Sequence, residues 1–302
     1  MTTRRTQARI LLNLSFPELA AKYATLPCDG VGLMRAEFLA LSIGTHPRKL
    51  IAEGGTEAFT GFFEEKIAQV AAAFAPRPVI YRTLDLKSNE YAGLDGGAAY
   101  EQKEENPMLG YRGCSRYVAE PECFRLELQA VNRARAQGFD NIKLMLPFVR
   151  LPEELRQCRA WIEEEGLLSQ PGFELWMMAE LPSNVLLIEE FLPHVHGVSV
   201  GSNDLTQLIL GIDRDNRRLS AQFDERHPAV LAGMERIARA ARARNLPVSI
   251  CGNAPSRYPE MLETLLRFGF TSFSVAPESF ERTVAAVAAA EQKLAAEAQG
   301  GR

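Results

Sequence analysis

Two acidic residues each follow a short apolar run. Glu180 comes after Leu-Trp-Met-Met-Ala, and Asp204 closes Gly-Val-Ser-Val-Gly-Ser-Asn-Asp. A buried strand reads as a continuous apolar run of about four to eight residues, so a carboxylate at its end emerges where the chain leaves the sheet. Carboxylates from two neighbouring strands can hold one hard cation, and oxygen ligands favour Mg²⁺ or Mn²⁺ over zinc. The spacing therefore predicts that Glu180 and Asp204 bind Mg²⁺ or Mn²⁺ at a sheet edge.

The ends of other apolar runs carry chemistry that complements a metal. Arg35 and Arg82 close the second and third runs, and Cys251 follows the seventh. Arginine presents a planar, permanently charged fork to phosphate or carboxylate, so the two arginines are expected to clamp a small phosphorylated acid. Cys251 is then expected to act as an acid or base over the substrate carbon, although a free cysteine more often only packs.

Strand-like runs alternate with helical patterns along the whole chain, and these elements must position the reactive residues. The runs are Arg9–Leu14, Gly30–Met34, Pro78–Tyr81, Ile142–Leu146, Leu175–Met178, Gly197–Val200, Pro247–Ile250 and Ser272–Val275. Proline in a plausible first helical turn predicts that helices open at Pro152 and Pro259. Strands that alternate with helices predict right-handed βαβ units and a parallel sheet. Eight such units predict an α/β fold of the (β/α)₈ TIM barrel type, formed by residues 1–302 as a single domain, with the strand-end residues at its active face.

Composition excludes several classes of partner. The 302 residues carry a formal net charge of −4, which gives no general attraction to nucleic acid or to an anionic membrane. No apolar run approaches the roughly 18–20 residues of a membrane span. The cysteines are scattered without a Cys-x-x-Cys pair, which predicts a reducing cytoplasm. Those expected only to pack are Cys28, Cys114, Cys123 and Cys158.

The histidines and one long connection have simpler interpretations. His194 and His196 precede a strand, at the barrel end opposite to the predicted site, so they are not expected to bind metal. His46 and His227 stand in His-Pro loops and are expected to be structural. The stretch Asn89–Arg116 predicts an extra loop, and a loop of that size on a compact barrel is usually functional.

The strand-end residues lie in longer phrases, which are Gly30-Val-Gly-Leu-Met-Arg-Ala-Glu-Phe-Leu, Lys87-Ser-Asn-Glu-Tyr, Glu105-Asn-Pro-Met-Leu-Gly-Tyr-Arg-Gly, Ala179-Glu-Leu-Pro-Ser-Asn, Gly201-Ser-Asn-Asp-Leu-Thr-Gln and Cys251-Gly-Asn-Ala-Pro-Ser. Together these phrases resemble the PEP-utilising enzyme family over nearly the whole chain. Within that family, the likeness is greatest to the C-terminal PEP/pyruvate-binding barrel of the phosphoenolpyruvate synthases.

This resemblance implies a role for each matching residue. Arg35 and Arg82 would bind the phosphate of PEP, Glu180 and Asp204 would hold Mg²⁺, and Cys251 would be the proton donor. The other implied substrate-binding residues are Arg112, Gly201, Ser202, Asn203 and Arg214. The implied activity is that of a phosphotransferase, which moves a phosphoryl group between a phosphohistidine and the enolate of pyruvate.

Some features depart from the family pattern. Asn253 stands where the synthases usually have glutamine, and Tyr81–Asp85 reads more like enzyme I of sugar transport. The 302 residues leave no room for the ATP-binding domain or for the swivelling domain whose histidine carries phosphate. The chain is therefore expected to take phosphate from a histidine on another domain or chain, and the family suggests a homodimer. Two alternatives remain, a non-catalytic PEP/pyruvate sensor and a Mg²⁺-dependent pyruvate lyase of related fold.

Overall fold

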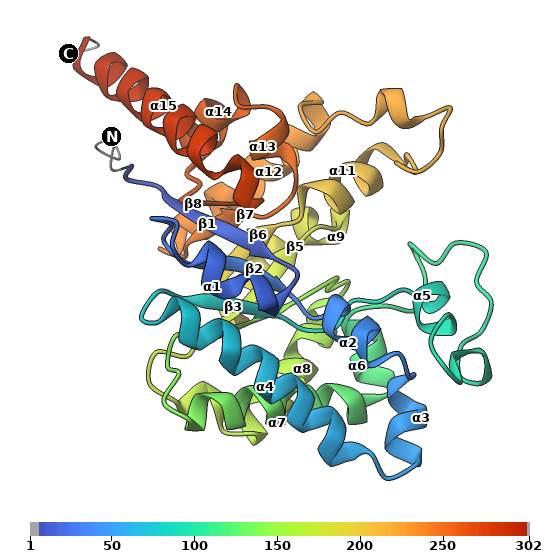
Figure 1. Cartoon of the computed structure of the whole chain (residues 1–302). Coiled ribbons are helices and arrows are strands. Elements are labelled where there is room, and N and C mark those ends of the chain that lie inside the picture. The colour runs from blue at the N-terminus through green and yellow to red at the C-terminus, as the bar shows by residue number, and fades with distance from the viewer. Residues whose placement is uncertain (1–5, 301–302) are drawn as a thin grey trace. The chain divides into compact units, whose positions relative to one another are not determined.

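A computed structural model describes residues 6–300, and its strands follow one another in chain order around a closed barrel (Figure 1). The strands are β1 (Arg9–Leu14), β2 (Val31–Arg35), β3 (Val79–Arg82), β4 (Ile142–Leu146), β5 (Leu175–Ala179), β6 (Gly197–Val200), β7 (Val248–Ile250) and β8 (Ser272–Val275). The predicted (β/α)₈ barrel is confirmed. Every predicted strand boundary lies within one residue of the observed one, and Arg35 and Arg82 are the last residues of their strands.

Helices connect the strands. They are α1 (Ala20–Tyr23), α2 (Glu37–Ile43), α3 (Pro47–Ala52), α4 (Thr56–Phe74), α5 (Ser88–Ala92), α6 (Cys114–Ala119), α7 (Pro121–Ala136), α8 (Pro152–Glu164), α9 (Pro182–Leu186), α10 (Ile188–Phe191), α11 (Ser202–Leu210), α12 (Pro228–Ala243), α13 (Ala254–Arg257), α14 (Met261–Phe268) and α15 (Phe280–Gly300). Short 3-10 turns are η1 (Pro17–Leu19), η2 (Gly97–Ala99), η3 (Leu167–Ser169), η4 (Leu192–His194), η5 (Ser220–Gln222) and η6 (Pro277–Ser279).

Proline opens several of these helices, because its missing N–H is not needed in the first turn and its fixed φ suits the helix. Pro152 begins α8 as the sequence predicts. The helix predicted to open at Pro259 instead begins at Met261, because Pro259 and Glu260 form the turn before it. None of the helices between residues 6 and 300 combines the length and apolar character needed to cross a bilayer.

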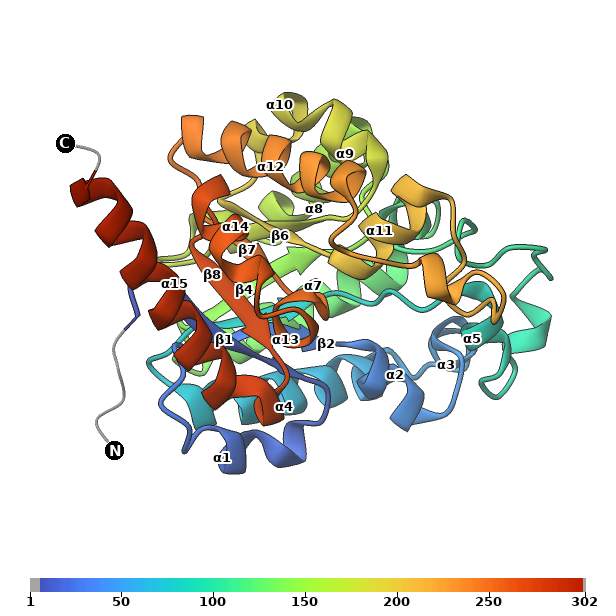
Figure 2. The ribbon, with the colours of Figure 1, turned by 90° about the horizontal axis from the view of Figure 1, so that it is seen from above.

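The chain divides into two compact units. The first unit contains the described residues up to Asn13, then Pro27–Gly32 and the chain from Met177 onward. In it, β8 pairs with both β1 and β7, with Ile10 opposite Phe273. Helix α12 packs on α9, α14 and two strands (Figure 2). Its buried face carries Val230, Met234 and Ile237. Both β5 and β6 are buried at every position, as parallel strands covered on two faces should be.

The second unit contains Leu14–Leu26 and Leu33–Trp176. Here β3 pairs with β4, and the long helix α4 packs along α7 (Figure 1). The rings of Phe59, Phe63 and Phe74 on α4 are fully buried, and each such ring stabilises the fold by about 1.5–3 kcal/mol. The predicted extra loop is an ordered excursion that includes α5 and η2.

Candidate active site

The two acidic residues of the predicted metal site lie at one end of α11 in the first unit. Glu180 directly follows β5, and a methyl group at Gly201 would overlap its Oε2 atom. Gly201 is the N-cap of α11, and Asp204 is the third residue of that helix. Glu180 is 2% exposed and Asp204 is 9% exposed. The absence of a side chain at Gly201 is therefore what lets the Glu180 carboxylate lie against the first turn of α11.

The turn that carries Glu180 is held by its own helix. The side-chain oxygen of Asn184 accepts hydrogen bonds from the backbone N–H groups of Glu180, at 3.1 Å, and Leu181, at 3.0 Å. This is the capping arrangement that satisfies N–H groups at a helix start, here at α9. It fixes the backbone from which the Glu180 carboxylate projects.

The loops after β6 and β7 lock together behind the acidic pair. The Ser202 hydroxyl donates to Glu225, and the Asn253 backbone N–H donates to Asn203 Oδ1 at 3.3 Å. Gly252 fits closely against Ser202, where a methyl group would overlap the hydroxyl oxygen. Glu225 is buried, and burial raises the pKa of its carboxyl group. Ser202 and Asn203 thus connect the acidic end of α11 to the loop that carries Cys251.

Cys251 follows β7 directly and is 2% exposed. Its backbone N–H donates to the Val200 carbonyl at 3.1 Å, and its Sγ donates to the same oxygen at 3.7 Å. Asn13 Nδ2 donates to the Cys251 carbonyl at 3.1 Å. The Cys251 loop is therefore held by the carbonyl of β6 and by the side chain of Asn13.

Arg214 is the most exposed of the predicted residues in the first unit. Its guanidinium lies 4.0 Å from Asp204 Oδ1, with 39% of its side chain exposed. Its backbone N–H donates to Gln207 Oε1 at 3.4 Å, which ties the loop after α11 back to that helix. An exposed pair at this distance contributes little to stability, so Arg214 is available to meet an anion.

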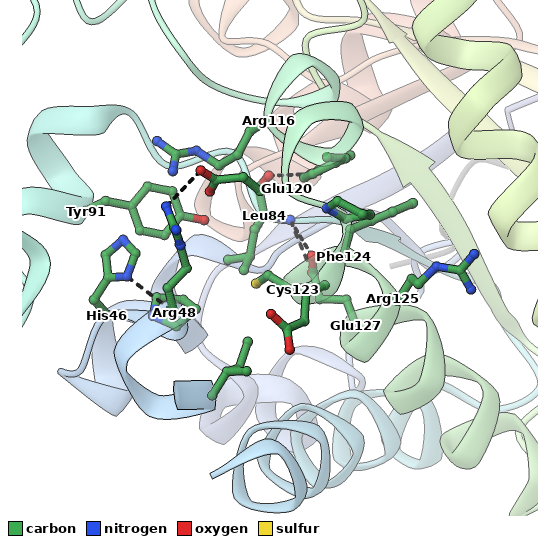
Figure 3. Close-up of a pocket in the computed structure, with 15 residues that line it drawn as sticks. His46, Arg48, Leu84, Tyr91, Arg116, Glu120, Cys123, Phe124, Arg125 and Glu127 are labelled. Atoms are coloured by element: carbon green, nitrogen blue, oxygen red, sulfur yellow. Dashed lines mark hydrogen bonds and ion pairs between the residues drawn. The ribbon is translucent and has the colours of Figure 1, made fainter. Parts of the chain in front are cut away.

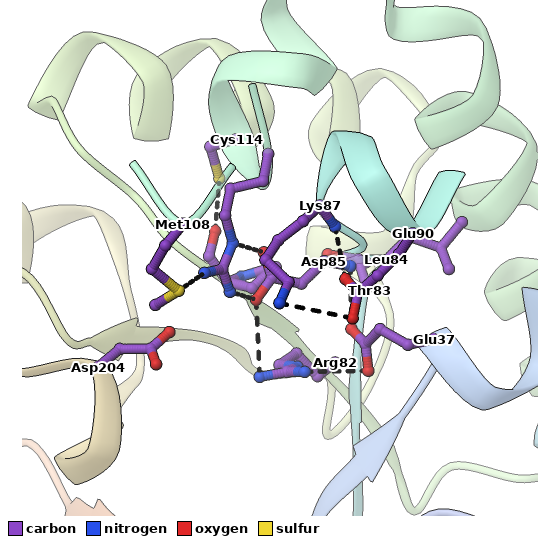
Figure 4. Close-up of polar contacts among 12 residues, drawn as sticks. Glu37, Arg82, Thr83, Leu84, Asp85, Lys87, Glu90, Met108, Cys114 and Asp204 are labelled. Atoms are coloured by element: carbon purple, nitrogen blue, oxygen red, sulfur yellow. Dashed lines mark hydrogen bonds and ion pairs between the residues drawn. The ribbon is translucent and has the colours of Figure 1, made fainter. Parts of the chain in front are cut away.

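In the second unit, Arg82 lies among carboxylates (Figure 4). One of its terminal nitrogens is 2.9 Å from Glu37 Oε2, and another is 3.9 Å from Asp85 Oδ2. Glu37 also accepts the backbone N–H of Asp85 at 2.9 Å. Arg35 is half-buried at the end of β2, two residues before Glu37. The carboxylates fix the orientation of the Arg82 guanidinium before any ligand arrives.

Arg112 is held still more firmly. Its Nε and Nη2 atoms donate to the two oxygens of Asp85 at 2.9 and 2.6 Å, and its guanidinium lies 4.0 Å from the centre of the Phe148 ring. Bidentate pairing and stacking are what distinguish arginine from lysine. Asp85 therefore contacts both Arg82 and Arg112, and the two arginines form one cluster with Glu37 and Asp85.

The amino-acid sequence was compared with known proteins. Residues 1–292 match the family described as PEP-utilising enzyme, PEP-binding domain. The chain belongs to this family. A probable phosphoenolpyruvate synthase of Staphylothermus marinus is 48% identical over 296 residues, and the phosphoenolpyruvate synthase of Aeropyrum pernix is 46% identical over 297 residues.

Both matches cover 96% of this chain but only 35% and 36% of the relatives, so the chain spans just over a third of their length. Among solved structures, an HpcH/HpaI aldolase/citrate lyase family protein from Burkholderia cenocepacia has a TM-score of 0.52 at 15% identity, and the match covers 97% of this chain and 96% of that one. At this identity the likeness concerns the fold alone.

For this member of the PEP-utilising enzyme family, the predicted residues divide between the two units. The first unit carries Glu180, Gly201, Ser202, Asn203, Asp204, Arg214 and Cys251, and the second carries Arg35, Arg82 and Arg112. Within each unit the structure brings most of them together. Their catalytic and binding roles stay predictions.

The donor set of the first unit fits Mg²⁺ better than a metal that needs a full protein cage. In the described part of the chain, no group of three or more His, Cys, Asp or Glu residues is placed to hold a metal. Mg²⁺ typically keeps several waters and takes one or two carboxylates together with substrate oxygens. Glu180 and Asp204, buried at the start of α11, match that pattern.

Sequence reasoning missed the residues that orient the others. Glu37, Asp85, Glu225 and Asn13 were not singled out, although Asp85 stands three residues after Arg82 in the sequence. That spacing between an acid and a strand-end arginine is the one feature of the sequence that indicates an orienting carboxylate.

The remaining cysteines and histidines mostly follow the prediction. Cys28, Cys114 and Cys158 are buried, whereas Cys123 is half-buried. The imidazoles of His46 and His227 accept backbone N–H bonds at the starts of α3 and α12, as expected for structural residues.

Proposed function

We propose that this chain is the PEP- and pyruvate-binding part of a phosphoenolpyruvate synthase-like phosphotransferase. Phosphoryl transfer would run, with Mg²⁺, between a phosphohistidine and the enolate of pyruvate. The observation that carries the proposal is the joining of Glu180, Asp204 and the Cys251 loop at one end of α11, in a chain of a PEP-binding family. Relatives almost half identical to this chain bear the name phosphoenolpyruvate synthase, which supports it.

Arginines of the second unit would bind the phosphate. Arg35 and Arg82 would clamp it, since guanidinium groups match the geometry of phosphate oxygens. Arg112 shares Asp85 with Arg82, so it would keep that carboxylate oriented and the cluster rigid. Groups oriented before the ligand arrives lose little freedom on binding, which favours the transition state of phosphoryl transfer.

Glu180 and Asp204 would hold Mg²⁺, or Mn²⁺ in its place. When bound, the cation would supply positive charge beside the enolate oxygen of pyruvate. Gly201, Ser202 and Asn203 would contact the substrate from the first turn of α11, where backbone N–H groups favour an anion. Arg214 would close over the same end of the helix.

Cys251 would move the proton at the methyl carbon. In the direction of PEP formation, its thiolate takes a proton from pyruvate, and the electrons of the C–H bond form the enolate. The enolate oxygen then attacks phosphorus as the bond from phosphorus to the histidine nitrogen breaks. In reverse, the thiol returns the proton to carbon.

Proton exchange tests this assignment without any phosphate donor. Pyruvate in D₂O with Mg²⁺ should lose its methyl proton signal in NMR when the chain is added. Removing one acid–base group typically costs about 10²–10⁴-fold in rate, so Cys251→Ala should abolish measurable exchange while Cys123→Ala retains it. Exchange that persists in Cys251→Ala would remove the proposed proton donor. No exchange with either Mg²⁺ or Mn²⁺ would contradict catalysis and favour the sensor.

The phosphate donor needs a separate experiment. We infer that the histidine belongs to another domain or protein, because His46 and His227 cap helices, and His194 and His196 lie just before β6. The swivelling domain of a phosphoenolpyruvate synthase relative would be mixed with this chain and labelled PEP. If the label never reaches the histidine, the proposed phosphoryl transfer is contradicted. Cleavage or condensation that depends on an added aldehyde would instead favour the lyase. The scattered cysteines suggest a cytoplasmic protein, and the family suggests a homodimer. Sedimentation of the purified chain would test the homodimer.

A further inference from the structure

A cavity of about 450 Å³ lies within the second unit (Figure 3), and Arg35, Arg82 and Arg112 do not line it. It is formed by α3, α5, α6, the first part of α7, and Leu84 in the segment after β3. Its volume falls within the range of about 300–1,000 Å³ that small-molecule sites occupy. None of the predicted catalytic or metal-binding residues lines it.

The wall of this cavity is mostly apolar and aromatic. Leu84, Tyr91, Tyr117 and Phe124 are buried side chains that line it, and the Tyr117 ring stacks on the Phe124 ring at 4.4 Å between centres. Ile51 of α3 completes one side and is half-buried. Such a surface gains most by covering a flat apolar molecule, because aromatic faces prefer offset or edge contacts with another ring.

The positive charges around the cavity are already neutralised. Arg48 pairs with Glu120 at 2.8 Å, Arg116 pairs with Glu101 at 2.7 Å, and Arg125 pairs with Glu164. A phosphate or carboxylate that entered would have to compete with these carboxylates. The surroundings therefore disfavour an anionic ligand.

One polar group lies in the wall and connects the cavity to the arginine cluster. Glu127 is fully buried, and its Oε1 accepts from the Tyr81 hydroxyl at 2.6 Å and from the Leu84 backbone N–H at 3.2 Å. Burial raises the pKa of this carboxyl group to about 8, so at neutral pH it is mostly uncharged and can donate as well as accept. Tyr81 and Leu84 stand on either side of Arg82 and Thr83.

We propose that this cavity is an effector site for a neutral aromatic molecule with a hydroxyl or similar polar group. The ring would lie among Tyr91, Tyr117 and Phe124, and the polar group would face the end of the cavity where Leu84 and Glu127 lie. Because Glu127 holds both Tyr81 and Leu84, occupancy acts on the segment that carries Arg82. The resulting change in substrate affinity rests on the proposed function of Arg82, whereas binding and the change at Leu84 do not.

Binding is tested with three probes of one shape and different charge, which are 2-naphthol, 2-naphthoate and 2-naphthylmethylammonium. Ligand-observed NMR on the full chain should show submillimolar affinity for 2-naphthol and affinity at least about tenfold weaker for both ions. Ile51→Trp fills the cavity and should abolish binding, whereas Ile51→Val leaves it open and should keep it. The proposed site is overturned if 2-naphthoate binds as tightly as 2-naphthol or more tightly. It is also overturned if Ile51→Trp has a native circular dichroism spectrum and still binds 2-naphthol with unchanged affinity.

The link to Arg82 is tested by hydrogen exchange, which needs no activity. Saturating 2-naphthol should change exchange of the Leu84 amide severalfold in the native chain and not in Ile51→Trp. Unchanged exchange at Leu84 overturns the effector role even if naphthol binds. If exchange changes and PEP binds, the Kd for PEP should shift by severalfold. If the chain binds 2-naphthol and exchange at the Leu84 amide changes, but PEP never binds, the proposed function is contradicted. The assignment of the cavity is unaffected by that result.

Discussion

Replacing Glu127 by glutamine should make the protein more stable at high pH. Burial raises the pKa of this carboxyl group to about 8 from an ordinary value of 4.5, and the nearby Glu37 charge adds to the effect. Between those pH values the folded chain binds a proton that the unfolded chain has lost. The free energy of unfolding of the wild type therefore falls as the pH rises through this window. Glutamine has the shape of the protonated acid and does not titrate.

The size of the effect follows from the two pKa values. Each tenfold difference in proton affinity is worth about 1.4 kcal/mol, so the full difference corresponds to about 5 kcal/mol at most. The hydrogen bonds from Tyr81 and Leu84 favour the charged form and are already included in that raised value. Below about pH 4.5 the two proteins should differ little, and above about pH 8 the variant should be several kcal/mol more stable.

Urea unfolding of both proteins at a series of pH values between about 4.5 and 9 measures this directly. Subtracting the two curves of unfolding free energy against pH removes the contribution of every other titrating group. Glu122→Gln is the matched control, because Glu122 is an exposed acid in the first turn of the same helix. Its difference from the wild type should stay within about 0.5 kcal/mol at every pH. Parallel curves for wild type and Glu127→Gln would refute the assignment of a buried, mostly protonated carboxyl group.

Two further substitutions test the two halves of the candidate site. Arg112→Lys cannot keep both hydrogen bonds to the buried Asp85, so the free energy of unfolding measured in urea should fall by about 1–3 kcal/mol. A fall of less than about 0.5 kcal/mol would contradict a structural role for this pair. Gly201→Ala puts a methyl group into the Glu180 carboxylate at a backbone conformation that alanine accepts, so Mn²⁺ affinity measured by electron paramagnetic resonance should fall about tenfold or more. Gly61→Ala, where the new methyl group meets nothing, should leave Mn²⁺ affinity unchanged, and equal affinities in all three proteins would argue against Glu180 as a ligand.

Much of the fold could be predicted because buried parallel strands have a local signature. Runs such as Leu175–Ala179 and Gly197–Val200 are apolar at nearly every position, and both faces of these strands are covered. Proline at the start of α8 marked that helix in the same local way. Pro259 misled the prediction because a proline also suits the turn before a helix, and the sequence does not distinguish the two positions.

The positions of the candidate site residues could also be predicted from the sequence, because a residue at the end of a strand keeps its place when the strand is identified. Glu180, Asp204, Arg82 and Cys251 all lie where the runs of apolar residues end or just beyond them. Their residue types alone indicate oxygen ligands, an anion clamp and a proton carrier. The family match concerns the chain as a whole, and the roles of these residues stay predictions.

Only the tertiary structure decided which groups hold these residues in place. The bonds from Arg112 to Asp85 and from Ser202 to Glu225 join residues 27 and 23 positions apart, and no periodicity in the sequence specifies such pairs. The cavity beside Glu127 arises in the same way, where helices from distant parts of the chain leave space between their side chains. The sequence determined where the candidate site residues lie because strand patterns are local, whereas their partners, their burial and their proton affinities depend on long-range packing.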